Sequence, residues 1–137
     1  MTVKVTRDLA TCLAIRKSVF TQEQGIAEAD DVDGLDGTAV QVLFYVDQVP
    51  VGTARMLKDS DTGKIGRVAV LKPYRGHGHG ARLIEAAIHE AKRLGLLQVK
   101  LGSRVDTTAF YARLGFRPVG EVFDDVGIPH QTMVRDL

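Results

Sequence analysis

The sequence predicts a mixed α/β fold, in which one mixed and mostly antiparallel sheet carries helices on both faces. Two observations favour it. Three strand patterns separated by tight turns come first, which is typical of an antiparallel meander. A strong helical pattern with a strand pattern on each side follows, and a crossover of that length joins parallel strands. Strands followed by alternating helices and strands indicate a single layered sheet.

Length and composition limit the possible classes. At 137 residues we expect one domain, spanning residues 1–137. The formal net charge of +1 provides no broad field for a nucleic acid or a membrane surface, and we expect neither as a partner. Cys12 is the only cysteine, so no disulfide can form within the chain, and we expect its side chain to be a small buried hydrophobe. With no visible signal peptide or membrane-length apolar run, we expect a cytoplasmic protein.

The first half should contain a strand, a helix, a loop and the meander. Val3 and Val5 alternate with polar neighbours, and the apolar positions between Leu9 and Phe20 recur at helical spacing. Between Gln24 and Thr38 the helical spacing of apolar residues ends, and Gly, Ala and Asp predominate. This composition predicts a solvated acidic loop that could include a helical turn. The meander follows as strands 39–46, 51–57 and 65–71.

The second half should alternate helices and strands. The clearest helix runs from about His79 to Leu94, because small and branched apolar residues follow one side and Gly95 can end it. We expect a parallel strand at 96–101, a short helix at 107–114, and further strands that begin at 116–119 and finish at 131–134.

A glycine-rich loop lies between the third meander strand and this helix. Gly76, Gly78 and Gly80 alternate with two histidines, directly after Arg75. The loop lacks the Gly-Lys-Ser/Thr ending of a Walker A motif and the context of a dinucleotide fingerprint. Residues without a Cβ let backbone N–H groups crowd together, and a helix start leaves such groups unpaired. The pattern indicates a socket for phosphate oxygens, with Arg75 at its rim. The alternative is a loop in which the glycines only make a flexible turn.

Two motifs in this order resemble the GNAT acetyltransferase superfamily. The Arg75–Gly80 loop matches the family's Arg/Gln-x-x-Gly-x-Gly/Ala loop, and the segment Phe110–Phe116 resembles its later Phe-Tyr and Leu-Gly-Phe block. Shorter features near the two ends resemble the ElaA/YjcF-like branch: Arg16, Val19-Phe20, Glu23-Gln24, the acidic loop, and Gly127-Ile128-Pro129-His130 before Met133. The resemblance extends over essentially the whole chain.

The resemblance implies acetyl-CoA as the donor and a small-molecule or peptide amine as the acceptor. It also implies that the strand 67–71 splays from its parallel neighbour at 99–101, leaving a gap for the pantetheine arm. The backbone of Val68, Ala69 and Val70 would then pair with that arm like an added strand. The pyrophosphate would bind the backbone of Gly76, His77, Gly78, His79, Gly80 and Ala81.

One position departs from the family's usual pattern. Many relatives have Asn or Gln before the Phe-Tyr helix, where it binds the pantetheine arm, whereas this chain has Arg104. Arg104 or Arg113 could instead contact a phosphate of CoA.

Tyr111 is the predicted general acid for the departing thiolate. A phenol stays protonated at neutral pH and donates from a rigid arm, and the family uses the tyrosine of this motif in that role. The alternative is a core aromatic whose hydroxyl is hydrogen-bonded. We expect Phe110 to pack under the cofactor, and the N–H of Val70 could polarise the thioester carbonyl.

The general base has three candidates. Glu23 follows an apolar helical face near the family's acceptor cleft, and His130 lies between a turn and the last strand, where an imidazole could accept a proton. Each could instead be a surface residue without a role, in which case water would remove the proton. Arg16 could orient a carboxylate of the acceptor, or form an ion pair on the helix surface.

We predict no metal site. His77 and His79 lie within the phosphate loop, and no Cys pair or His-Glu-x-x-His motif accompanies them. The aspartates at 30, 31, 33 and 36 lack the glycine and terminal glutamate positions of a calcium loop. As a solvated acidic lip, they could attract a cationic amine.

These observations together predict an N-acetyltransferase that moves an acetyl group from acetyl-CoA to a primary amine by direct transfer in a ternary complex. A non-catalytic module that binds or senses acyl-CoA is the alternative, followed by a structural interaction protein. Relatives are often dimers, so a homodimer is possible.

Overall fold

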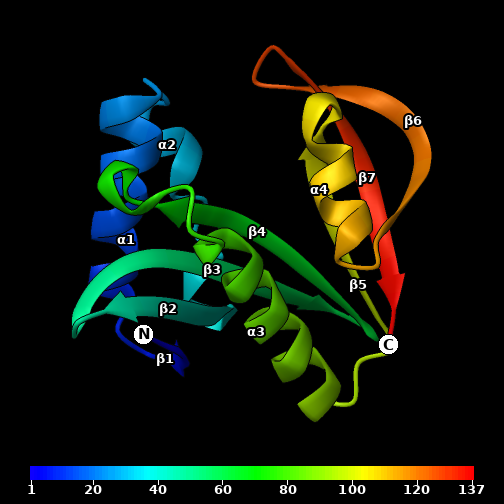
Figure 1. Ribbon diagram of the computed structural model, residues 1–137. Coiled ribbons are helices and arrows are strands. Elements are labelled where there is room, and N and C mark those ends of the chain that lie inside the picture. The colour runs from blue at the N-terminus through cyan, green and yellow to red at the C-terminus, as the bar shows by residue number, and fades with distance from the viewer.

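Seven strands form one sheet in the spatial order β1-β2-β3-β4-β5-β7-β6 (Figure 1). The computed structural model describes residues 1–137. The strands are β1 (Thr2–Thr6), β2 (Val40–Val46), β3 (Val49–Asp59), β4 (Thr62–Val70), β5 (Gln98–Arg104), β6 (Arg117–Asp125) and β7 (Ile128–Asp136). β4 and β5 are parallel and all other neighbours are antiparallel, so the predicted meander and crossover are confirmed.

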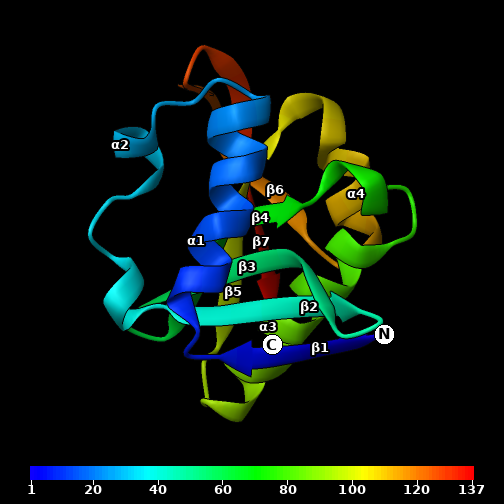
Figure 2. The same cartoon turned by 90° about the vertical axis from the view of Figure 1, so that its left-hand side faces the viewer.

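Helices cover the two faces of this sheet (Figures 1 and 2). The α-helices are α1 (Leu9–Arg16), α2 (Glu28–Asp31), α3 (His79–Arg93) and α4 (Thr108–Arg113). Short helical segments of other types are η1 (Lys17–Glu23), η2 (Asp36–Thr38), η3 (Lys72–Tyr74) and η4 (Val105–Thr107). α1 packs on Leu43 and Ala69 of one face, whereas α3 packs on Met56 and Ile65 of the other. The predicted fold class is confirmed.

The core lies mainly under α3. This helix buries a continuous apolar side because its alanines and isoleucines recur every three or four residues. Eleven buried residues form one cluster: nine come from α3, β3, β4, β5 and β7, and Leu96 and Phe116 come from the connections before β5 and β6. Tyr111 of α4 packs against it. α4 therefore joins α3 on one face of the sheet, while α1 with the completely buried Cys12 lies on the other.

β4 separates from β5 soon after the two strands begin to pair. Thr62, Gly63 and Lys64 align with residues of β5, and no later residue of β4 does. Between Thr53 and Arg55 of β3 the register shifts, and Arg67 on the opposite strand has a φ of 50°, which is unusual for a residue with a side chain. The splay that the family resemblance implied is confirmed.

Several boundaries differ from those expected, and those of β3, β4 and β5 shift by one to three residues. The first helix is regular only to Arg16 and continues as the π-helical η1. β6 and β7 are longer than predicted, because the turn Val126–Gly127 lets both strands continue into a hairpin. The segment 24–38 contains two helical turns, α2 and η2, rather than one loop. No helix is both long enough and apolar enough to cross a membrane.

Candidate active site

The glycine loop presents a row of backbone donors at the start of α3. Gly76 and Gly78 have φ values of 83° and 79°, a left-handed conformation that favours glycine. The first hydrogen bond of the helix runs from the N–H of Arg82 to the carbonyl of Gly78 at 3.2 Å. The N–H groups from Gly76 to Ala81 therefore have no partner in the protein. This end of a 15-residue helix also carries partial positive charge.

The free edge of β4 lies beside this loop. The N–H of Leu71 donates to Val51 of β3 at 2.8 Å, so the backbone groups of Val70 point the opposite way, toward the gap between β4 and β5. Nε of Arg75 donates to the carbonyl of Val70 at 2.8 Å. The N–H of Val70 thus remains available on this edge, whereas its carbonyl is occupied by Arg75.

Arg75 binds the candidate base Glu23 as well. Its two terminal nitrogens donate to the two carboxylate oxygens at 2.5 and 2.8 Å. This pairing lowers the pKa of Glu23, first through the hydrogen bonds and also through the charge of the guanidinium. Arg75 therefore connects η1, the end of β4 and the glycine loop, and its two terminal nitrogens bind the carboxylate of Glu23.

Tyr111 lies on α4, on the same face of the sheet as α3. Its ring lies edge-on to those of Phe110 and Phe116, with distances between ring centroids of 5.0 and 6.2 Å. Burial raises the pKa of the phenol, which keeps it protonated at neutral pH. Its hydroxyl has no hydrogen-bond partner in the protein, unlike the satisfied core aromatic that was the alternative. Phe110 and Arg113 beside it are exposed.

The second candidate base, His130, has a defined orientation. Nδ1 lies 2.8 Å from the carbonyl of Ile128, so this nitrogen carries the proton and donates it. Nε2 is then the accepting nitrogen, and it lies 3.9 Å from Asp125. His130 aligns with Arg104 at the end of β5. The side chain of Arg104 is exposed and pairs with Asp106 at 3.3 Å.

Arg16 forms no surface ion pair and cannot meet an acceptor, contrary to both expectations. Its side chain is completely buried. Nε and Nη2 donate to the carboxylate and carbonyl of Asp31, and Nη1 donates to Asp36 at 2.6 Å. Arg16 lies on the same buried side of α1 as Cys12 and Ile15. Its guanidinium is therefore covered by the segment that carries Asp31 and Asp36.

The prediction of a solvated acidic lip was wrong in part: Asp30 is exposed as expected, but the other three aspartates are bound by arginines. Asp31 and Asp36 are only 5% and 8% exposed, and Asp33 is bound by Arg55 at 2.6 Å. The hydrogen bonds from Arg55 hold the pKa of Asp33 far below its ordinary value. Arginines thus neutralise these three carboxylates, which removes the proposed attraction for a cationic amine.

Arg55, Arg67 and Gln41 complete this network and had not been selected from the sequence. Arg67 donates to the carbonyl of Asp31 at 3.2 Å and pairs with the carboxylates of Asp31 and Asp33. Gln41 donates to Asp36 at 3.1 Å. The only sequence signal for Arg55, Arg67 and Gln41 is that each is a polar residue between apolar or small residues of a strand, in β3, β4 and β2. The contacts of Arg67 also stabilise its left-handed backbone at the bulge.

The histidines of the glycine loop have different environments. His79 is buried and stacks on Phe44 at 4.4 Å, and burial lowers its pKa. His77 is exposed beside it. No group of three or more possible ligands is close enough to hold a metal ion.

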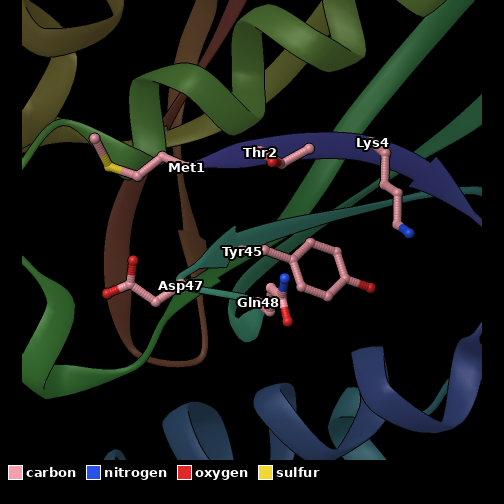
Figure 3. Close-up of a pocket in the computed structure, with 6 residues that line it drawn as sticks. All are labelled: Met1, Thr2, Lys4, Tyr45, Asp47 and Gln48. Atoms are coloured by element: carbon pink, nitrogen blue, oxygen red, sulfur yellow. The ribbon is translucent and has the colours of Figure 1, made fainter.

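A separate cavity lies between β1 and the β2–β3 turn and contains no predicted site residue (Figure 3). It is lined by Met1, Thr2, Lys4, Tyr45, Asp47 and Gln48.

The open β4–β5 pair and the donor-rich start of α3 are accompanied by clear similarity to known proteins. The family model described as "Acetyltransferase (GNAT) domain" matches residues 18–137, and the chain belongs to this family of acyltransferases. Protein ElaA of Escherichia coli is 34% identical over 134 residues, which are 94% of this chain and 88% of that protein. YjcF of Bacillus subtilis, an uncharacterized N-acetyltransferase, is 31% identical over 123 residues, 89% of this chain and 88% of that protein.

A solved structure agrees over nearly the whole chain. An acyl-CoA N-acyltransferase from Pseudomonas aeruginosa has a TM-score of 0.86 at 34% identity, covering 98% of this chain and 97% of that one. The resemblance to the ElaA/YjcF-like branch is thereby confirmed.

Proposed function

We propose that this protein is an N-acetyltransferase that transfers an acetyl group from acetyl-CoA to a primary amine while both are bound. The observation that carries the proposal is the run of unpartnered N–H groups from Gly76 to Ala81, next to the free edge of β4. A diphosphate can accept from such a row at a helix start. The extended pantetheine arm can then lie along β4, with the N–H of Val70 as a donor.

The reaction requires few groups from the chain. The amine nitrogen attacks the thioester carbonyl carbon, a C–N bond forms, and the C–S bond breaks. The thiolate takes the phenolic proton of Tyr111, whose hydroxyl has no competing partner and whose raised pKa keeps it protonated. The proton of the amine passes to Glu23, His130 or water. With the N–H of Val70 engaged by the pantetheine arm, the N–H of Val68, two residues earlier on the same free edge, is a suitable donor to the oxyanion of the tetrahedral intermediate.

The two candidate bases differ in their surroundings. Glu23 is ionised but engaged by Arg75, which makes it a weak acceptor for a proton until that pair opens. His130 has an oriented imidazole with an accepting nitrogen. The geometry therefore favours His130 or water while the Arg75–Glu23 pair is closed.

Release of free thiol from acetyl-CoA, measured over a panel of primary amines, tests this proposal. Tyr111→Phe is expected to lower kcat by about 100-fold or more, since general acid catalysis contributes that much. Affinity for CoA should change little, because the phenol is assigned to the leaving thiolate. Tyr45→Phe, which removes the same hydroxyl from β2, is the matched control and should keep the wild-type kcat. CoA binding without thiol release from any amine would instead support the acyl-CoA-binding module.

A further inference from the structure

A second cavity lies where β3, β4 and β5 come together, next to the loop that carries the neutralised aspartates. It has a volume of about 490 Å³. Three of its lining residues are Lys58, Lys64 and Lys100, one from each strand, together with Asp59; Leu35 and Thr38 form the wall on the loop side. We refer to it as the lysine cavity.

The lysine cavity is on the side of the sheet that α3 and α4 leave open. Ile65 points into the core under α3, so its neighbour Lys64 points to the opposite face. Arg67 points to that face too, since its guanidinium reaches Asp31 and Asp33. Lys64 and Lys100 are aligned in the parallel ladder at the last pair before β4 and β5 separate.

The charges in this cavity are unbalanced. Of its three lysines, Lys64 and Lys100 point into it, whereas Lys58 lies two residues from the core residue Met56 and points to the α3 face; with Asp59, the two ammonium groups leave a net charge of +1. None of the ion pairs in the chain includes a lysine, so Asp59 does not neutralise any of the three. Like charges on adjacent strands repel. An anion placed between Lys64 and Lys100 would relieve that repulsion.

The position relative to the splayed strands connects the cavity with the reaction. Val68, on the free edge of β4, is four residues beyond Lys64, or about 13 Å along an extended strand. A lysine side chain covers part of that distance. One acceptor molecule can therefore have its amine near the thioester and an anionic group several bonds away among the lysines.

We propose that the lysine cavity binds an anionic group, a carboxylate or a phosphate, of the amine acceptor. This inference rests on the proposed acetyl transfer and gives it a substrate class: amines that carry a negative charge at some distance from the reacting nitrogen. The buried arginines contribute by removing the negative charge of Asp31, Asp33 and Asp36 from the same face. A polycationic acceptor would meet an excess of positive charge there.

Binding can be measured without turnover. Aminohexanoate and inorganic phosphate are titrated into the ¹⁵N-labelled protein, and the backbone signals of Lys64 and Lys100 are followed by NMR. Both probes are expected to shift these signals, and Lys64→Gln/Lys100→Gln should weaken binding about tenfold or more, as expected for the loss of two close charges. Lys92→Gln, on an exposed turn of α3, is the control and should bind as the wild type does. Equal binding by the double variant and the wild type would overturn the proposal.

Turnover separates this inference from the proposed function. Thiol release is compared for three amines of equal length, ending in a carboxylate, an amide or a second ammonium: aminohexanoate, its amide and diaminohexane. We expect kcat/KM to be about tenfold higher for the carboxylate, and Lys64→Gln/Lys100→Gln to remove that preference. Acetylation of the amide or the diamine at least as fast would refute the anion site and leave the acetyltransferase standing. If none of a wider amine panel releases thiol, the proposed function fails, and the NMR titration alone decides whether the cavity binds anions.

Discussion

Arg75 and Glu23 lie 52 residues apart in the sequence and form a two-pronged ion pair, with nitrogen–oxygen distances of 2.5 and 2.8 Å. The same arginine binds the carbonyl of Val70 at the free edge of β4. The pair thus fastens η1 to the strand and the loop that are proposed to hold CoA. Because pantetheine and pyrophosphate would compete for Val70 and for Arg75, binding of CoA is expected to loosen Glu23.

Arg75→Gln is expected to move the acidic limb of the kcat/KM profile to higher pH if Glu23 is the base. The pKa of Glu23 is lowered by Arg75, so a carboxylate freed from this arginine titrates closer to its ordinary value. A pH–rate series on both proteins measures the shift. Arg93→Gln, which breaks the pair between Arg93 and Glu90 on α3, serves as control. An acidic limb that stays in place removes Glu23 as the base.

The same ion pair has a consequence for stability. The pKa of Glu23 is lower in the folded protein than its ordinary value of 4.5. The pair therefore stabilises the fold above that value, and this contribution is lost as the pH falls through the lower folded pKa. Urea unfolding across acidic pH should show a smaller acid-induced loss for Glu23→Gln, with Glu121→Gln, an exposed residue of β6, as control.

His130→Gln is expected to lower kcat/KM by about 100-fold if the imidazole takes the proton of the amine. Affinity for CoA should be unchanged, since His130 lies on β7 and not beside the glycine loop. Steady-state kinetics combined with calorimetric CoA binding measures both quantities. His89→Gln on the exposed side of α3 is the matched control. Retention of full activity by His130→Gln would leave water or Glu23 as the acceptor.

Gly78→Ala is expected to abolish the rise in Tm that CoA produces. Gly78 has a φ of 79°, and a Cβ there would meet no protein atom within 4 Å, so it would project into the space proposed for the pyrophosphate. Gly95→Ala is a close control, because Gly95 has a φ of 76° and equally open surroundings at the other end of α3. Both variants should lose about 1–2 kcal/mol of stability from backbone strain. Only Gly95→Ala should still be stabilised by CoA, and a normal shift in both would argue against the phosphate socket.

Arg16→Met is expected to destabilise the fold by about 3–5 kcal/mol, because it leaves the buried carboxylates of Asp31 and Asp36 without their main partner. Arg117→Met should cost less than about 1 kcal/mol, since both partners of its pair with Asp136 are exposed. Urea denaturation at neutral pH compares them. Equal small losses in the two variants would show that the buried network contributes little.

This network should also make stability fall in acid. Burial alone would raise the pKa of Asp36, but the hydrogen bonds from Arg16 and Gln41 outweigh it and the pKa is lowered; Arg55 lowers that of Asp33. Both carboxylates therefore stabilise the fold above their ordinary pKa of 3.8, and this contribution is lost as the pH falls further. In Arg16→Met, the loss of unfolding free energy that comes from protonation of Asp36 should disappear from a plot of unfolding free energy against pH.

The sequence by itself determined the order of strands and helices, the amphipathic α3 and the unpaired donors of the glycine loop. These are local properties: side-chain periodicity sets the buried face of α3, and glycine permits the left-handed turns at Gly76 and Gly78. Only the tertiary structure decided which arginine pairs with which carboxylate. Arg16, Arg55 and Arg67 lie 15 to 36 residues from the aspartates that they bind, and Arg75 lies still further from Glu23. Whether a carboxylate is solvated or neutralised depends on which distant side chains pack around it, and spacing along the chain does not contain that information.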